Sequence, residues 1–229
     1  MGYVDGIGRI CVRKLILGVL GSAAALAFAT PSLAQSTVTF NDGNGGLGTG
    51  ETLLASFSPG STGGVVCAGT GCVIQTGSNT LGADPAVGGM GDPYLSVLGQ
   101  GTASFTFAGG LSQLGLDYGS ADTYNFFQLL FAGGATQNFS GQNLITAGTA
   151  DGNQSSPRTN GRLTFLANAG QSITGLNLSS GQNSLEIDNV GTIGAVPEPG
   201  TWAMMLFGFG AIGSSMRRRR RHSGIAATA

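Results

Sequence analysis

Histidine, lysine and charged residues of any kind are scarce in this 229-residue chain. Only 9% of the residues are charged, and the single histidine is His222, near the C-terminus. From Gln35 to Ala195 there are nine acids, two arginines and no lysine, which gives a net charge of −7. A region without histidine cannot use one as a general base or as the partner of a catalytic cysteine. A region this acidic has no electrostatic footprint for nucleic acid, so we expect no such partner.

Cysteine is also rare. Cys11 lies near the N-terminus, and Cys67 and Cys72 lie in the sequence Cys-Ala-Gly-Thr-Gly-Cys. Two cysteines this close are expected to form a disulfide in an oxidising compartment. A structural metal site would need further Cys or His ligands, which this region lacks. We therefore predict a Cys67–Cys72 disulfide with a modest effect on stability, because the loop that it closes is short.

The first 34 residues follow the three-part pattern of a secretory signal peptide. Basic residues come first, then an apolar run over residues 15–29, then Ser32-Leu33-Ala34 with small residues at the two required positions. The basic residues are Arg9, Arg13 and Lys14. The pattern predicts export by the Sec translocon and cleavage by signal peptidase before Gln35, with loss of Cys11. An uncleaved membrane anchor is the alternative.

Residues 35–195 have the pattern of an all-β domain. Short runs of alternating apolar residues recur between clusters of Gly, Asn, Asp and Ser, and 32 of these 161 residues are glycine, which disfavours helices. We predict a single antiparallel β-sandwich or jelly-roll-like domain from about residue 36 to 192. The candidate strands are 36–40, 52–57, 73–75, 94–98, 102–107, 114–118, 126–131, 162–166, 173–178 and 184–190.

Alternation also predicts which side chains form the core of this domain. The run 126–131, apolar apart from Gln128, is typical of a central strand, so we expect it to be the most buried one. The expected core residues are Phe105, Phe107, Leu116, Phe127, Leu129, Phe165 and Ile187.

A few acids of the β domain are the candidates for chemistry. Two carboxylates could hydrolyse a glycoside, but the sequence does not fix the separation of any pair. The acids for that reaction are Asp117, Asp122, Glu186 and Asp188. Calcium prefers carboxylate and carbonyl oxygens, and its candidate ligands are Asp117, Asp122, Asn125 and Asp188. The alternative for Asp122 and Asn125 is a tight turn that they stabilise.

Aromatic side chains could stack on sugars. Those that the sequence offers are Tyr94, Tyr118 and Tyr124, whereas most of the phenylalanines are expected in the core. With no histidine and no defined carboxylate pair, we expect a protein that is not an enzyme. We also expect no cofactor, calcium remaining the one alternative.

Three elements follow one another in the C-terminal tail. The tripeptide Pro197-Glu198-Pro199 precedes an uncharged 17-residue run, Gly200–Met216, and the arginine cluster follows. As a helix the run is about 25 Å long, at the short end of what spans a bilayer. Arginines favour the cytoplasm, so the run is predicted to be a transmembrane helix that stops translocation. Its anchoring residues are Trp202, Met204, Met205, Leu206, Phe207, Phe209 and Ile212, and the stop-transfer residues are Arg217, Arg218, Arg219, Arg220 and Arg221.

This three-part order resembles the PEP-CTERM sorting signal of exported proteins of Gram-negative bacteria. The resemblance rests on Pro-Glu-Pro, on a Gly-rich apolar run that contains Trp-Ala-Met-Met, and on the arginine cluster; residues 223–229 extend beyond the usual end. It implies that an exosortase, a membrane-embedded cysteine transpeptidase, recognises Pro197, Glu198 and Pro199 and removes the anchor. Two short motifs, Asp117–Asn125 and Ser184–Asn189, resemble the ectodomain of a subgroup of these proteins, which implies surface display and matrix association.

The predicted organisation is a signal peptide at 1–34, a β-sandwich ectodomain at 35–195, a sorting signal at 196–222 and a short cytoplasmic tail at 223–229. Two classes of function fit it. The first is a structural protein of the cell surface or extracellular matrix, associated with exopolysaccharide in a biofilm and sorted by an exosortase after a transient stay in the inner membrane. The second is a carbohydrate-binding or glycan-hydrolysing exoprotein that uses the same route. An acidic cleft would favour the second, and a packed sandwich with only polar loops would favour the first.

Overall fold

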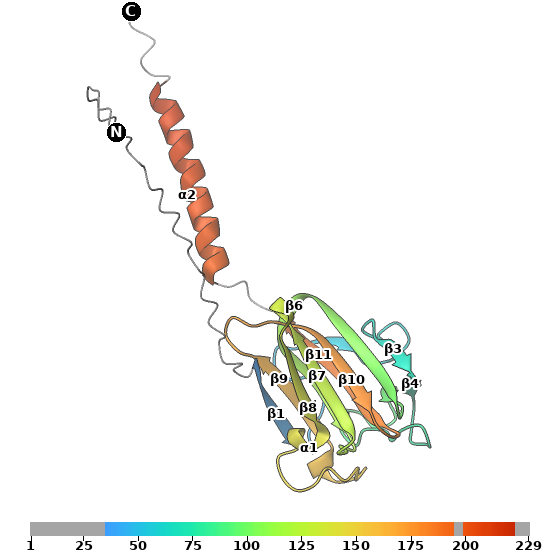
Figure 1. Ribbon diagram of the computed structural model, residues 1–229. Coiled ribbons are helices and arrows are strands. Elements are labelled where there is room, and N and C mark those ends of the chain that lie inside the picture. Colours follow the sequence, from blue (N-terminus) through green and yellow to red (C-terminus); the bar gives the residue numbers. More distant parts are fainter. Residues whose placement is uncertain (1–34, 195–198, 223–229) are drawn as a thin grey trace, which may run out of the picture. The chain divides into compact units, whose positions relative to one another are not determined.

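The computed structural model describes residues 35–194 and 199–222 (Figure 1). The predictions on residues 1–34, on Pro197 and Glu198, and on residues 223–229 lie outside this part of the chain. The strands are β1 (Ser36–Asp42), β2 (Thr52–Ala55), β3 (Val66–Gly69), β4 (Cys72–Gln75), β5 (Tyr94–Val97), β6 (Gly101–Gly119), β7 (Asn125–Phe131), β8 (Thr136–Ser140), β9 (Gly161–Ala167), β10 (Ile173–Ser180) and β11 (Leu185–Gly194). The helices are η1 (Ala132–Gly134), α1 (Gly141–Leu144), η2 (Pro157–Thr159) and α2 (Pro199–His222).

The long strand β6 divides the antiparallel sheet into two layers. Its first half pairs with β3 and β10, whereas its second half pairs with β9 and β11. The register with β10 shifts between Thr106 and Leu111, and Gly109 and Gly110 in this stretch have φ of 83° and 72°. Backbone in that region is easy only for glycine, so the pair permits the bend.

We call the two layers the β7 layer and the β9 layer, each after one of its strands. The β7 layer consists of β3, the first half of β6, β10, β7 and β8; β7, β8 and β10 run side by side in Figure 1. The β9 layer consists of β1, β9, the second half of β6, β11, β2, β5 and β4. The predicted all-β, antiparallel fold is confirmed.

Aromatic rings from the two layers meet in the core. Phe127 on β7 lies 5.0 Å from Tyr118 on β6 and 6.4 Å from Phe165 on β9, measured between ring centroids. Phe139 on β8 lies 5.3 Å from Phe165. The layers therefore pack face to face as a sandwich. All seven predicted core residues are buried.

Three details of the strand prediction are wrong. The runs 102–107 and 114–118 belong to one strand, β6, and the sequence analysis missed β3 and β8. The run 126–131 is not the most buried strand, because β7 alternates and Phe126 is 48% exposed. All four residues of β5 are buried instead. A loop covers that strand, and Ser96 of β5 donates a hydrogen bond to the Leu81 carbonyl of the loop.

The predicted disulfide between Cys67 and Cys72 is present, with Cα atoms 5.5 Å apart. Cys67 lies on β3, which pairs with β6 in the β7 layer. Cys72 begins β4, which pairs with β5 in the β9 layer. The bond therefore links the edges of the two layers. A loop this short is expected to contribute about 2 kcal/mol.

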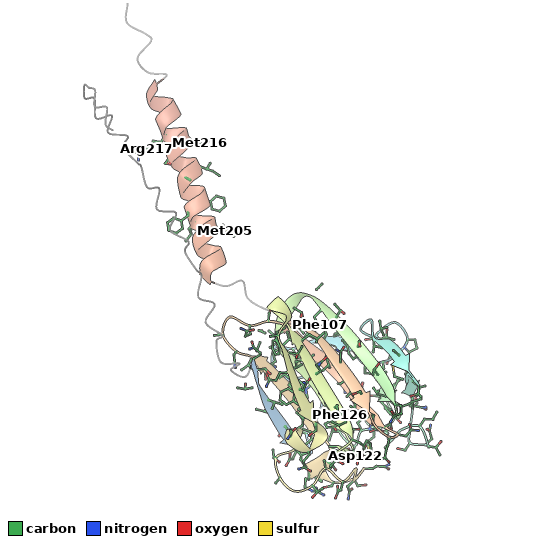
Figure 2. All side chains as sticks on the ribbon, viewed as in Figure 1. Phe107, Asp122, Phe126, Met205, Met216 and Arg217 are labelled. Carbon is green, nitrogen blue, oxygen red and sulfur yellow. A yellow bond between two sulfur atoms is a disulfide. The ribbon has the colours of Figure 1, made fainter. Side chains whose placement is uncertain are left out.

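The tail residues from Pro199 to His222 form helix α2. The side chains described on it are exposed: Met205, Leu206, Phe207, Phe209, Ile212, Met216 and Arg217 (Figure 2). Among the helices in the described ranges, none has the length and apolar character needed to cross a membrane. The transmembrane assignment of residues 200–216 stays a prediction.

Candidate functional site

Asp117, a predicted calcium ligand, belongs to a buried ion network. It lies on the outer face of the β9 layer, opposite Arg162 in the β6–β9 register. Arg162 Nη1 is 3.2 Å from Asp117 Oδ1, and Nη2 contacts Glu51. All three side chains are at most 6% exposed. Because each carboxylate is compensated by the same guanidinium, this group holds the loop that contains Glu51 against the sheet.

Backbone and amide donors complete this network. Gly46 N–H donates to Asp117 Oδ2 (2.8 Å), as does Asn189 Nδ2 (2.9 Å). Burial opposes ionisation of Glu51, but hydrogen bonds from Gln113 and the Gly48 N–H, with the charge of Arg162, hold its pKa below the ordinary value. Its carboxylate is therefore ionised in the folded protein, as an ion pair requires.

Glu186, a candidate catalytic acid, is occupied by structural hydrogen bonds. Its Oε1 accepts from the Ala83 N–H (3.1 Å) and from the Ser184 hydroxyl, and its Oε2 accepts from the Ser120 hydroxyl (2.7 Å). Burial raises its pKa, although these three hydrogen bonds act in the opposite direction. The carboxyl group ties β11 to the end of β6 and to the loop that covers β5.

A small polar pocket lies beside Glu186 and contains Asp122. Its volume is about 190 Å³, below the usual range of small-molecule sites. Asp122 and Phe107 lie near opposite ends of the β domain (Figure 2). The pKa of Asp122 is raised by burial and by the nearby Asp151 carboxylate, while a hydrogen bond from Tyr124 lowers it. Asp151 itself pairs with Arg158 at 2.8 Å.

Asp188 is the least compensated acid of the β domain. It lies opposite Asp117 in the β6–β11 register and is 3% exposed, and its Oδ1 makes no hydrogen bond to another described residue. Burial and, less strongly, the carboxylates of Asp117, Asp92 and Asp84 raise its pKa to about 7, against the lowering effect of a hydrogen bond from the Asn189 backbone.

The structure does not bring the four predicted calcium ligands together. Asp117 and Asp188 are neighbours on the β9 layer, whereas Asp122 lines the polar pocket. The Asn125 side chain is buried, where it donates to the Tyr118 hydroxyl (3.1 Å) and accepts from the Ser180 hydroxyl (2.9 Å). Across residues 35–194 and 199–222, no cluster of three or more Asp, Glu, His or Cys side chains is arranged to hold a metal ion.

The three tyrosines proposed for sugar stacking do not form a common exposed surface. Tyr94 and Tyr118 are completely buried, and only Tyr124 lines the polar pocket. Burial, together with the Glu186 charge, raises the pKa of Tyr94 to about 12. The exposed aromatic side chain of the β domain is Phe126 on β7, labelled in Figure 2, which the sequence analysis assigned to a buried strand.

Phe126 lies in a groove of about 700 Å³ on the outer face of the β7 layer. The sequence analysis missed this groove. Hydroxyls and neutral amides surround the Phe126 ring, the buried residues Phe127, Phe139 and Leu178 complete the lining, and none of the lining side chains carries a charge. The only sequence signal for it is Gln128, which interrupts the apolar run 126–131 and, with Phe126, alternates with the buried Phe127 and Leu129.

Comparison with known proteins finds few relatives. No curated protein matches the sequence. An exo-β-1,3-galactanase of Phanerochaete chrysosporium, solved with galactose, is 14% identical with a TM-score of 0.34, over 70% of this chain and 30% of that one. A family 11 carbohydrate-binding module of a Clostridium thermocellum cellulase is 13% identical with a TM-score of 0.25, over 67% of this chain and 99% of the module. Similarity at this level identifies neither a ligand nor an activity.

The C-terminal tail has a specific match. Residues 195–221 match the family model of the PEP-CTERM protein-sorting motif. This range contains the Pro-Glu-Pro tripeptide, the apolar run and the arginine cluster on which the sequence prediction rests. The chain therefore carries a PEP-CTERM sorting motif, which implies an exported protein and processing by an exosortase.

Proposed function

We propose that this protein is a non-enzymatic component of the cell surface or extracellular matrix that associates with exopolysaccharide. The observation that carries the proposal is the sorting motif at residues 195–221, which follows directly on a folded β domain. In this account the Sec translocon exports the chain and signal peptidase removes residues 1–34. The tail then holds the β domain at the inner membrane until the exosortase cleaves it.

The character of α2 supports a transient anchor. The exposed fraction of its described apolar side chains lies between 47%, at Met205, and 75%, at Phe207. A helix that exposes so many apolar side chains is expected to bury them against a membrane or another apolar surface. A run of 17 residues with four glycines is a short anchor, suited to a protein that leaves the membrane after processing.

The use of the acids in the β domain supports a non-enzymatic role. Glu186 accepts three hydrogen bonds, and Asp117 belongs to the Arg162 ion network. A glycosidase needs a pair of carboxylates that flank a bound sugar. The polar pocket that contains Asp122 and Glu186 has a volume of only about 190 Å³, which leaves little room for an oligosaccharide.

Carbohydrate binding is the second candidate, and the groove on the β7 layer favours it over hydrolysis. This groove is more than three times larger than the polar pocket and contains no carboxylate. Neutral hydrogen-bonding side chains around an aromatic ring suit a polar ligand with apolar faces, which is the chemistry of a sugar. Binding without cleavage is also what a matrix component requires.

Variants of the tripeptide test the sorting part of the proposal. We expect the double variant Pro197→Ala/Glu198→Ala to be exported but not processed, so that it accumulates in the inner membrane with its tail. The matched control is Gly194→Ala, because an added Cβ at Gly194 meets no atom within 4 Å. Fractionation followed by detection with antibodies against the β domain and against the tail would separate the forms. Normal release of the double variant would refute exosortase sorting.

A further inference from the structure

We propose that the groove on the outer face of the β7 layer binds a single chain of a neutral polysaccharide. This inference rests on the proposed association with exopolysaccharide and adds a binding face, a ligand class and two residue roles. The argument starts from the strand register, which places the outward side chains of four strands in two parallel rows.

The first row, which we call the amide row, crosses β6, β10, β7 and β8. Asn177 lies opposite Ser104 on one side and opposite Gln128 on the other, and Gln128 lies opposite Asn138. Asn177 Nδ2 donates to Gln128 Oε1 (3.0 Å), and Gln128 Nε2 donates to Asn138 Oδ1 (3.0 Å). Each amide thus holds the next in place, so the row is ordered before any ligand arrives.

The ends of the amide row are available to a ligand. Asn177 Oδ1 and Asn138 Nδ2 make no hydrogen bond to another described residue. One end therefore offers an acceptor and the other a donor. A sugar hydroxyl can both donate and accept, so a chain of sugar rings can satisfy both ends.

The second row, which we call the Phe126 row, runs beside the first. Ser179 lies opposite Thr102 and Phe126, and Phe126 lies opposite Ser140. Phe126 is 48% exposed and has small hydroxyl residues on both sides, so its ring rises above its neighbours. The C–H face of a sugar ring can pack on this aromatic surface while its hydroxyls reach the amide row.

The size of the face suits a polymer chain better than a single sugar. Four neighbouring strands span about 14 Å, at about 4.8 Å between strands. The groove volume of about 700 Å³ lies within the range of established ligand sites. A monosaccharide would leave most of both rows unoccupied, so the proposed occupant crosses the strands as a chain of several rings.

The absence of charge selects a neutral polymer. None of the residues that line the groove is charged, and residues 35–195 have a net charge of −7. An acidic polysaccharide would be repelled by the domain and would find no arginine or lysine in the groove. A protein partner is disfavoured because such interfaces concentrate several apolar and aromatic anchors, whereas this groove presents one exposed aromatic ring.

The test uses the exported protein purified from the producing cells. The probes are the polysaccharides of those cells' own extracellular matrix, separated by anion exchange into a neutral and an acidic fraction. Affinity electrophoresis in gels that contain each fraction measures retention. We expect retention by the neutral fraction only, and we expect it to be unchanged by salt because no ion pairs form.

Two substitutions test whether the polysaccharide binds to this face. Phe126→Ala removes the stacking surface, and Gln128→Glu puts a negative charge in the centre of the amide row. Each is expected to weaken binding at least about tenfold. The controls are Leu166→Ala, which truncates a side chain that is 49% exposed on the other layer, and Thr39→Glu, which adds a charge at an exposed position of β1. Thermal unfolding of all four variants checks that they are folded.

The outcomes separate this inference from the proposed function. Retention by the neutral fraction that is lost in Phe126→Ala and Gln128→Glu, and kept in both controls, supports the inference. Retention by the acidic fraction, or retention that Phe126→Ala leaves unchanged, overturns the inference while polysaccharide association stands. If neither fraction retains the wild-type protein, both the groove and the proposed association are wrong.

Discussion

The two outer faces of the sandwich differ in what they do with polar side chains. The outer face of the β9 layer carries charged residues that loops cover: Asp117, Arg162, Glu186 and Asp188 are all at most 6% exposed. Asp117 pairs with Arg162, and Glu186 accepts hydrogen bonds from neutral donors. The outer face of the β7 layer carries neutral amides and hydroxyls that remain open to solvent in a groove. The acids that the sequence analysis proposed for chemistry therefore lie in covered, structural positions, whereas the neutral amides and hydroxyls that it did not single out are accessible to a ligand.

Breaking the ion network of the β9 layer should have the largest effect. Arg162→Met keeps an unbranched apolar side chain close to the length of the arginine stem, but it leaves Glu51 and Asp117 buried without a countercharge. We expect a loss of about 3–5 kcal/mol in the free energy of unfolding, measured by denaturant titration. The matched control is Arg158→Met, which breaks the exposed pair with Asp151 and should cost less than about 1 kcal/mol. Equal losses in the two variants would mean that the buried network has no special role.

The pH dependence of stability sharpens the comparison at Asp188. The folded-state pKa of about 7 lies above the ordinary value of 3.8. The stabilising contribution of this group is therefore complete below about pH 4 and is lost as the pH rises through 7. Wild-type protein should be less stable at pH 8 than at pH 5, whereas Asp188→Asn should be more stable than wild type at pH 8. With allowance for solvent screening, we expect Asp188 to lower the free energy of unfolding of the wild-type protein by about 1–2 kcal/mol between pH 5 and pH 8.

Glu186 also contributes to the pH dependence of stability, and its contribution must be separated from that of Asp188. Its pKa is also raised, so it contributes pH dependence of the same sign that Asp188→Asn retains. Glu51 has a lowered pKa, and its contribution is lost only as the pH falls below its ordinary value of 4.5, outside the window compared. A pH profile that Asp188→Asn leaves unchanged between pH 5 and 8 would contradict the account of Asp188.

A substitution on the β7 layer should have the smallest effect on stability. Gln128→Ala removes the centre of the amide row but leaves no buried group without a partner. We expect a change within about 0.5–1 kcal/mol in the same denaturant titration. A loss comparable to that of Arg162→Met would mean that the amide row is structural, and that the two faces do not differ in the way described.

Much of the fold follows from alternation in the sequence. Phe105, Phe107 and Leu116 are buried as predicted, because apolar residues two apart in a strand point to the same face. The bend in β6 was not predictable, since Gly109 and Gly110 look like an ordinary turn between two strands. Strand β7 was misjudged because Phe126 is apolar yet lies on the open face.

The candidate site was harder to predict, because the sequence shows acids without their partners. Asp117 meets Arg162 from 45 positions away, and Glu51 meets the same guanidinium from 111 positions away. The amide row depends on the register of four strands, which only the folded sheet defines. The sorting tail could be identified because its three elements are contiguous and need no tertiary structure.

The most direct test of the central claim is the intact mass of the protein recovered from the cell surface and the medium. The account predicts a form that begins at Gln35 and has lost the segment after Pro-Glu-Pro, apart from any group that the exosortase adds. A native surface form that still contains residues 200–221 would contradict exosortase processing, whatever the β domain binds.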